Sequence, residues 1–289
     1  MTAARVPSAA PETGRLSFSD LPGWAEDDLD AAAAALRQGG VTIDGDARSY
    51  FETRFRPGVP LRGHFTGYYE PELDAARGPS AEFPCPIHAP PVGGVGAPRA
   101  EIEPLLAGYE IAWLRDPVDR FFLQVQGSGR LRFADGGTLR VGYAGTNGQP
   151  YVSIGKRLIE RGLLGPNLTA EALKAWLRVD PARGLRAMAE NPSYVFFKVS
   201  DAPAGQGPQG TLCQVTALRS LAVDPDHTLL GTPIWVEVAG HARLCIAQDT
   251  GSAIKGAGRA DLFFGTGDAA GRAAGALNAM GRFVPLVPR

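Results

Sequence analysis

The residues with the strongest chemical signal lie in one segment near the C-terminus, LCIAQDTGSAIKGAGRADLFFG, residues 244–265. An apolar run leads into Asp249 and a glycine-rich stretch, and Asp261 follows directly before residues 262–264, LFF. A carboxyl group beside apolar side chains loses hydration, so its pKa should rise. A general acid at neutral pH needs such a raised pKa. Asp261 is therefore our candidate acid; the alternative is that it only caps a turn before a strand.

Asp249 has two further interpretations. Asp-Thr-Gly is a common turn, in which the carboxylate accepts bonds from the backbone N–H groups of Thr250 and Gly251. Residues 249–253, DTGSA, also match the signature of aspartic proteases, in which two carboxylates share one proton. The chain has a single Asp-Thr-Gly, about 40 residues from its end. A protease would have to dimerise through it and would lack room for a following flap, so this is the less favoured enzyme.

An aromatic and polar cluster, GHFTGYYEP, occupies residues 63–71. Aromatic rings stack on the apolar faces of sugars, and hydroxyl or amide groups bind sugar hydroxyls. Gln124, Gln126 and Ser128 add uncharged polar groups beside a glycine turn. Glu70 is the candidate for a second catalytic carboxylate, although the proline after it favours a role in a turn.

The elements expected to position these residues begin with a helix from about Glu26 to Gly39-Gly40. Residues 1–16 are rich in Pro, Ala and Ser and predict a flexible end. The Pro- and Gly-rich residues 78–98 predict a long surface connection. The alternating run FFLQVQ, residues 121–126, predicts a strand. Glycine turns then connect it to strands at 131–133 and 139–143 in an antiparallel meander.

The C-terminal half predicts two short helices followed by strands. The helices begin after Thr169 and after Asp180-Pro181. Short strands are expected at 194–199, 212–217, 233–238, 244–248 and 262–264, with turns at 203–210 and 224–227. This pattern is typical of a small barrel or sandwich. A terminal helix is expected at 269–280. The helical residues expected to face inward are Leu173, Trp176, Leu177, Leu185 and Met188.

Composition excludes several classes of function. Hydrophobic residues are 44% and charged residues 20% of the chain, and the net charge is −1, which argues against a nucleic-acid partner. No apolar run approaches the roughly 18 residues of a membrane span. The start, MTAARVPSAAPETGRLSF, lacks the apolar run of a signal peptide, so we expect either a cytoplasmic protein or a leader that was removed.

Metal and disulfide chemistry have little support in the sequence. Cys85, Cys213 and Cys245 are scattered and are expected to be buried thiols, and the four histidines form no ligand pair. No metal and no cofactor is expected, and the motifs of serine hydrolases, Walker loops and dinucleotide-binding folds are absent from the sequence.

Taken together, four blocks, the second of them in two parts, resemble the membrane-bound lytic murein transglycosylase A family. They occur in the family's order and span most of the chain from about residue 60. They are FTGYYEP (65–71), FFLQVQGSGRLRF (121–133), VGYAGTNGQPYVSIGKRLIERG (141–162), NPSYVFFK (191–198) and QDTGSAIKGAGRADLFFG (248–265).

The resemblance implies a mainly β fold with a few helices. A six-stranded double-psi β-barrel is expected from residues 1–70 and 201–289, together with the N-terminal helix. A smaller β-rich domain, residues 71–200, is inserted into it, and a glycan groove lies between the two.

The resemblance also implies cleavage of the β-1,4 bond between N-acetylmuramic acid and N-acetylglucosamine, leaving 1,6-anhydromuramic ends. Asp261 matches the family's catalytic aspartate and Asp249 its second groove aspartate. A non-catalytic, expansin-like peptidoglycan-binding protein is the alternative outside enzymes. The expected substrate-binding residues are Thr66, Tyr68, Tyr69, Gln126, Ser128, Gly251 and Lys255.

The expected partner is the peptidoglycan glycan strand, bound by a monomer. The family implies a periplasmic location, attachment to the outer membrane and association with cell-wall enzyme complexes. The sequence shows no lipobox, and its first cysteine is Cys85.

Overall fold

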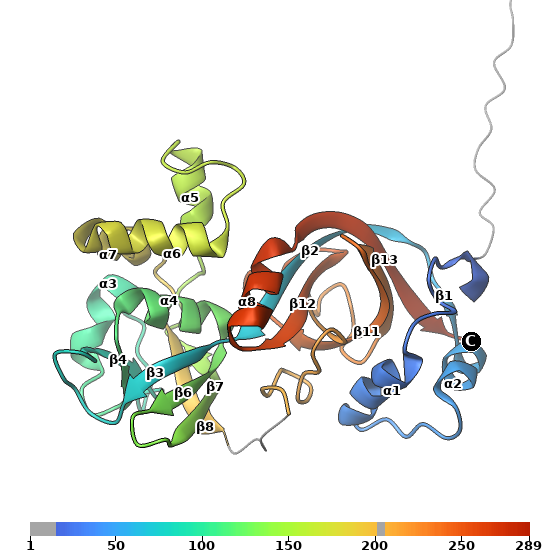
Figure 1. The fold of residues 1–289 in the computed structure, drawn as a ribbon, viewed down its shortest axis with the longest axis horizontal. Helices are drawn as coiled ribbons and strands as arrows, with labels where there is room; N and C mark the ends of the chain where they lie inside the picture. Colours follow the sequence, from blue (N-terminus) through green and yellow to red (C-terminus); the bar gives the residue numbers. More distant parts are fainter. Residues whose placement is uncertain (1–15, 201–205) are drawn as a thin grey trace, which may run out of the picture.

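The computed structural model describes residues 16–200 and 206–289, and a closed barrel dominates it (Figure 1). The strand order is β1-β13-β10-β11-β9-β12-β2, and β2 also pairs with β13, so six strands close on themselves and β1 extends β13. The pairs β2–β12 and β9–β11 are parallel and the others are antiparallel. The predicted six-stranded barrel is confirmed. The six strands of the barrel are β2 (Leu61–Glu70), β9 (Ser220–Val223), β10 (Pro233–Val238), β11 (His241–Thr250), β12 (Arg259–Thr266) and β13 (Asn278–Pro288), and the additional strand is β1 (Phe55–Pro57).

A second sheet lies beside the barrel and uses only residues between β2 and β9. Its order is β4-β5-β3-β6-β7-β8, and the predicted antiparallel pairing of residues 131–133 with 139–143 is present as β6–β7. The strands are β3 (Glu72–Ala76), β4 (Cys85–His88), β5 (Glu110–Leu114), β6 (Ser128–Phe133), β7 (Thr138–Thr146) and β8 (Val195–Ser200).

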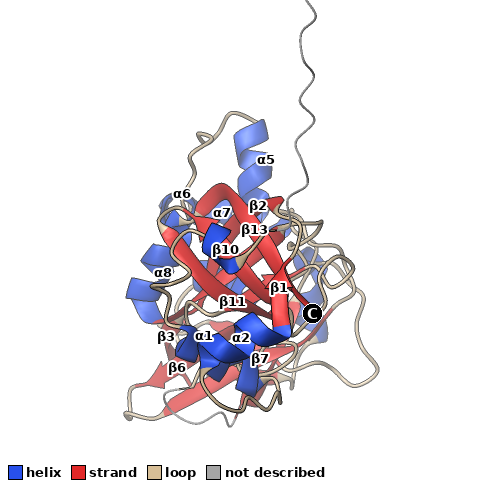
Figure 2. Cartoon of the chain, turned by 90° about the vertical axis from the view of Figure 1, so that its right-hand side faces the viewer, coloured by secondary structure: helices blue, strands red, loops and turns tan. Residues whose placement is uncertain are grey.

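Helices cover both units, and in Figure 2 α1 and α2 lie across one end of the barrel. None of the helices in residues 16–200 and 206–289 combines the length and the hydrophobicity that a membrane span requires. The helices are η1 (Phe18–Asp20), α1 (Leu29–Gln38), α2 (Ala47–Arg54), α3 (Arg99–Ile102), η2 (Glu103–Leu105), α4 (Pro117–Gln126), α5 (Ile154–Glu160), α6 (Ala170–Val179), α7 (Pro181–Ala189) and α8 (Gly267–Ala276).

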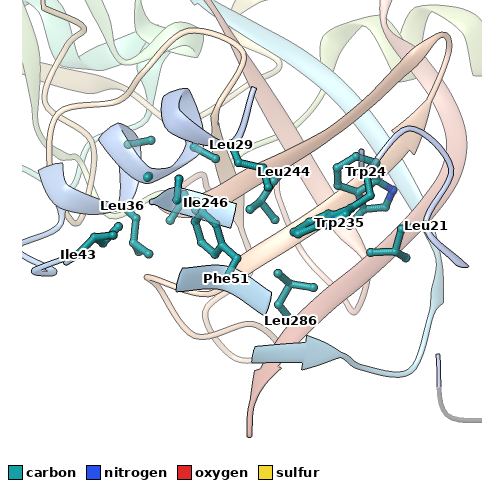
Figure 3. Packing of buried hydrophobic residues seen from close by; sticks show 14 of the residues in the cluster. Leu21, Trp24, Leu29, Leu36, Ile43, Phe51, Trp235, Leu244, Ile246 and Leu286 are labelled. Atoms are coloured by element: carbon teal, nitrogen blue, oxygen red, sulfur yellow. The ribbon is translucent and has the colours of Figure 1, made fainter. Parts of the chain in front are cut away.

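The strand β10 is apolar on both faces because both of its faces are covered. Along β10, Ile234 and Val236 point into the barrel, whereas Trp235 points outward into a core formed with α1 and α2 (Figure 3). There the ring of Trp24 meets that of Trp235 at a centroid distance of 5.3 Å. This outer core fixes the N-terminal helices on β10, β11 and β13, and β11 carries the candidate residue Asp249.

The prediction of a strand at residues 121–126 is wrong, because these residues end helix α4. The side chain of Asp116 caps the helix by accepting a bond from the backbone N–H of Asp119, and Pro117 occupies the first turn. Gly127 ends the helix with φ +78, a conformation that glycine favours. The Asp-Pro signature at Asp116 is the same one that correctly predicts α7.

Other predictions also need correction. The expected connection at 78–98 contains the strand β4. The strand expected at 212–217 is absent, because this segment bends over the end of β11, where the N–H of Leu212 donates to the carbonyl of Gln248. Leu185 is 51% exposed, because α7 buries Gly184, Ala187 and Met188 instead. The terminal helix α8 ends at Ala276, and β13 follows.

The remaining helix predictions agree in part with the structure. Thr169 and Asp180 cap α6 and α7 as expected, and α1 begins at Leu29, three residues after the predicted start. Helices α2 and α5 were not predicted. Of the flexible segment expected at 1–16, only residue 16 is among the described residues. The first part of the turn expected at 203–210 also lies outside them.

Candidate active site

A cavity of about 220 Å³ lies where the barrel faces the second sheet and its helices. One wall comes from β2, β11, β12 and residues 251–254, which follow β11. The other wall comes from the neighbourhood of α3, α4 and the segment before β8. The polar side chains that line the cavity include Tyr68, Asp249, Arg259 and Asp261 on the barrel wall, and Arg99, Gln124, Gln126, Tyr151, Asn191 and Ser193 on the opposite wall.

Asp261 lies inside β12, between Thr66 of β2 and Ala222 of β9 in the sheet register. The interpretation of Asp261 as a turn cap is therefore wrong. Its Oδ1 accepts a bond of 2.5 Å from the Thr66 hydroxyl. Desolvation raises the pKa of Asp261 to about 6, although the Thr66 bond and the positive charge of Arg259 oppose the shift. Asp261 can thus hold a proton in mildly acidic solution and release it near neutrality.

Asp249, the next to last residue of β11, has a different environment. Its Oδ2 accepts a bond of 3.0 Å from the Tyr68 hydroxyl. Its Oδ1 accepts bonds from the backbone N–H groups of Thr211 and Thr250, both at 2.9 Å, and from the Thr211 hydroxyl at 3.0 Å. Desolvation raises the pKa of Asp249, and these four bonds oppose the shift. Both oxygens are therefore occupied by donors, which suits a fixed anion better than a proton carrier.

Strand β2 brings the aromatic and polar cluster of residues 63–71 to the same place. Thr66 and Tyr68 are paired in register with Asp261 and Phe263 of β12. Between them, Gly67 allows α8 to approach, since a Cβ there would lie 2.7 Å from the backbone of Ala274. The alternation of β2 therefore sends both hydroxyl groups towards the two aspartates.

The other predicted binding residues divide into two groups. Gln126 and Gly251 line the cavity, and Oε1 of Gln126 accepts a bond of 3.0 Å from the backbone N–H of Tyr69. Tyr69, Ser128 and Lys255 do not line it. The Tyr69 ring lies beside α8, Ser128 is buried at the start of β6, and Lys255 pairs with Asp224 at 3.1 Å.

Sequence reasoning missed most of the second wall. Arg99 is held by Gln124 Oε1 at 2.5 Å and by the carbonyls of Ser193 at 2.6 Å and Asn191 at 3.1 Å. Burial lowers the pKa of Arg99 to about 10, so it stays charged near neutrality. Asn191 and Ser193 lie in the block NPSYVFFK, but no local signal marks Arg99.

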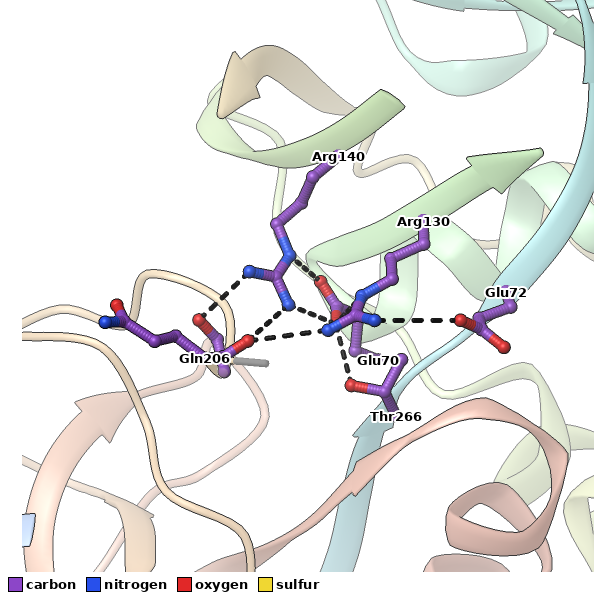
Figure 4. Close-up of polar contacts among 7 residues, drawn as sticks. Glu70, Glu72, Arg130, Arg140, Gln206 and Thr266 are labelled. Carbon is purple, nitrogen blue, oxygen red and sulfur yellow. Dashed lines mark hydrogen bonds and ion pairs between the residues drawn. The ribbon is translucent and has the colours of Figure 1, made fainter. Parts of the chain in front are cut away.

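Glu70 does not line the cavity. Its side chain is fully buried and receives two bonds from Arg140, at 2.6 and 2.8 Å, and one from Arg130 at 3.0 Å (Figure 4). The Thr266 hydroxyl donates a fourth, at 2.8 Å. Glu70 therefore joins the end of β2 to β6, β7 and β12.

The structure has a closed barrel and a second sheet, with two half-buried aspartates in the cavity between them, and comparisons with known proteins identify the family. The family description "MltA specific insert domain" matches residues 96–198, and "3D domain" matches residues 219–287. The chain is 38% identical over 236 residues to the membrane-bound lytic murein transglycosylase A of Vibrio cholerae and 38% identical over 234 residues to that of Escherichia coli K12. These alignments cover 75% of this chain and 63% and 64% of the relatives.

Solved structures agree with this assignment. A membrane-bound lytic murein transglycosylase from Agrobacterium tumefaciens shares 30% identity, with a TM-score of 0.84 and coverage of 95% of this chain and 97% of that one. The lytic transglycosylase LtgG of Burkholderia pseudomallei shares 38% identity, with a TM-score of 0.63 and 99% coverage of both chains. The chain belongs to the membrane-bound lytic murein transglycosylase A family.

Proposed function

We propose that this protein is a lytic transglycosylase that cleaves the β-1,4 bond between N-acetylmuramic acid and N-acetylglucosamine. The observation that carries the proposal is the contrast between the two aspartates: Asp261 has a raised pKa of about 6, and Asp249 has both oxygens occupied. The names of the relatives support it, as does an E. coli MltA structure with bound chitohexaose, which is 28% identical with a TM-score of 0.76 over 96% of this chain and 92% of that one.

The mechanism needs one proton-transferring carboxyl group. Protonated Asp261 donates its proton to the glycosidic oxygen as the bond to muramic C1 breaks. The resulting carboxylate then accepts the proton of the C6 hydroxyl of the same muramic residue, and that oxygen bonds to C1. A 1,6-anhydro ring closes, no water is consumed, and Asp261 returns to its protonated form. A hydrolase would require a second carboxyl group as base or nucleophile.

Asp249 is proposed to act as a fixed negative charge. Positive charge develops at the sugar ring as the glycosidic bond breaks. A carboxylate held by four donors needs no rearrangement to stabilise that charge. Tyr68, Gln126 and Gly251 are proposed to contact the glycan in the cavity, whereas Tyr69 and Lys255 would contact it only where the strand extends further. Ser128 is buried, so we do not propose a contact for it.

The domain division and the cellular setting are parts of the same proposal. Residues 1–70 and 201–289 form the catalytic barrel unit, and residues 71–200 form the inserted unit opposite. We propose a periplasmic monomer, associated with the outer membrane and with other cell-wall enzymes, because its substrate lies there and its relatives are named membrane-bound.

Digestion of purified sacculi tests the proposal. The protein should release muropeptides with anhydro ends, and Asp261→Asn should release none while it still sediments with sacculi. Binding without release by the wild-type protein would instead show a non-catalytic wall-binding module. Cleavage of peptide bonds, lost in Asp249→Asn, would show an aspartic protease.

A further inference from the structure

Arg259 lies next to the Thr66–Asp261 pair and completes a chain of three side chains across β2 and β12. Its Nη2 contacts the Thr66 hydroxyl oxygen at 2.8 Å, and that oxygen contacts Asp261 Oδ1 at 2.5 Å. Its Nη1 is fixed by the carbonyls of His64 at 3.3 Å and Ala260 at 2.6 Å. Both carbonyls belong to strands, so the guanidinium has little freedom to turn away.

The donor and acceptor groups of Arg259, Thr66 and Asp261 fix the direction of the two hydrogen bonds between them. A guanidinium has no acceptor, so the Thr66 oxygen must accept from Arg259. Among the described residues, the Thr66 hydroxyl has no other acceptor for its single hydrogen than Asp261. Thr66 therefore donates to Oδ1 of Asp261.

The other oxygen of Asp261 is left for the proton. In the described part of the chain Oδ2 makes no hydrogen bond, and it is not among the buried polar atoms that lack a partner. Oδ2 therefore reaches the cavity that Asp261 lines.

We propose that Arg259 is a positioning residue, which orients the Thr66 hydroxyl so that Asp261 carries its exchangeable proton on Oδ2, facing the substrate. The inference rests on the proposed transglycosylase function. Arg259 acts through Thr66 and does not transfer a proton itself. Because Arg259 fixes the Thr66 hydroxyl, the same oxygen of Asp261, Oδ2, carries the proton in every turnover.

Other charged groups also face Asp261 and must be separated from this effect. Arg259 and His64 favour its ionised form, and Asp249 disfavours it. The Tyr68 hydroxyl, bonded to Asp249, lies in the same field. Substitutions at Thr66 leave all four groups in place, so Thr66 isolates the hydrogen bond.

The first arm of the test measures protonation without any enzyme assay. The carboxyl carbon of Asp261, labelled with carbon-13, is titrated by NMR in the wild-type protein, Thr66→Val and Thr66→Ser. Loss of a bond to the carboxylate should raise the pKa of Asp261 in the valine variant, and serine should restore the wild-type titration. Equal titration of the valine and serine variants would overturn the inference, whether or not the protein is a transglycosylase.

The second arm is a double-mutant cycle on anhydro-product release. Thr66→Val and Arg259→Gln should each lower kcat by about tenfold to a hundredfold, with little change in KM. Arg259→Gln should cost much less in the Thr66→Val background, because its path to Asp261 is already broken. An equal cost in both backgrounds would show that Arg259 acts by charge alone. Thr138→Val and Arg272→Gln, both at exposed positions, are the matched controls.

Discussion

Asp261 and Asp249 lose hydration in the same cavity, and their hydrogen bonds give them different properties. Asp261 accepts one bond, from Thr66, so burial dominates and its pKa rises to about 6. Asp249 accepts four, which hold both of its oxygens. Pairs of acids whose environments differ in this way divide the roles of proton donor and fixed charge.

A pH profile should show the titration of Asp261. Because the free enzyme must carry the proton, kcat/KM should fall above about pH 6, by about tenfold per pH unit. Initial rates on solubilised glycan strands would be measured from about pH 4 to about pH 9. A rate that stays level through neutrality would contradict a protonated Asp261 as the acid.

Replacing Asp261 should also stabilise the fold at high pH. The folded-state pKa of about 6 lies above the ordinary value of 3.8. The Asp261 carboxyl group therefore does not lower the free energy of unfolding below about pH 4, and it lowers it by the full amount above about pH 6. In Asp261→Asn the free energy of unfolding should be higher than in the wild-type protein by about 1–3 kcal/mol at high pH and should be unchanged in acid. Thermal melts at both pH values check this, with the exposed Asp226→Asn as control. Equal melting temperatures at high pH would contradict a desolvated Asp261.

Asp249→Asn should weaken catalysis and shift the profile. The loss of a preorganised charge should lower kcat by about 10²-fold, less than the loss of the acid itself. Because the charge of Asp249 raises the pKa of Asp261, the fall in kcat/KM should begin at lower pH in this variant. An unchanged profile would show that Asp249 exerts no field on Asp261.

At the scale of elements, helix caps and apolar runs predicted part of the structure. Thr169 and Asp180 mark helix starts in the sequence, and the apolar run of residues 233–238 is β10 itself. The run FFLQVQ alternates as a strand does, yet it is helical, because the cap at Asp116 and the glycine at Gly127 bound one continuous helix. The helix cap at Asp116 and the helix-ending glycine Gly127 therefore predict the structure of this segment better than the alternation of six residues does.

Glu70 joins these elements, and its loss should affect stability more than chemistry. Removing one partner of a buried ion pair costs about 3–5 kcal/mol, and Arg140 would be left uncompensated. We expect Glu70→Gln to unfold at much lower denaturant, while its folded fraction keeps activity within a few-fold. Glu72→Gln, which loses only a half-exposed contact to Arg130 at 3.8 Å, is the control. A stable but inactive Glu70→Gln protein would favour an inverting hydrolase with Glu70 as its base.

At the scale of the whole molecule, the site joins residues that are distant in the sequence. Thr66 and Asp261 are 195 residues apart and meet only because β2 and β12 pair in parallel. The family blocks pointed to both residues, but no local pattern predicts that they touch. Arg99 reaches the cavity from the start of α3, between β4 and β5, and the carbonyls of Asn191 and Ser193 hold it there. Such contacts arise from closure of the barrel and docking of the second sheet.

An isotope experiment tests most directly whether one carboxyl group cuts the glycan without water. Sacculi are digested in water enriched in heavy oxygen, and the muramic ends are analysed by mass spectrometry. We expect anhydro ends that carry no heavy oxygen, and no such product from Asp261→Asn. Reducing muramic ends that carry heavy oxygen at C1 would show that water is the nucleophile and would contradict a transglycosylase mechanism.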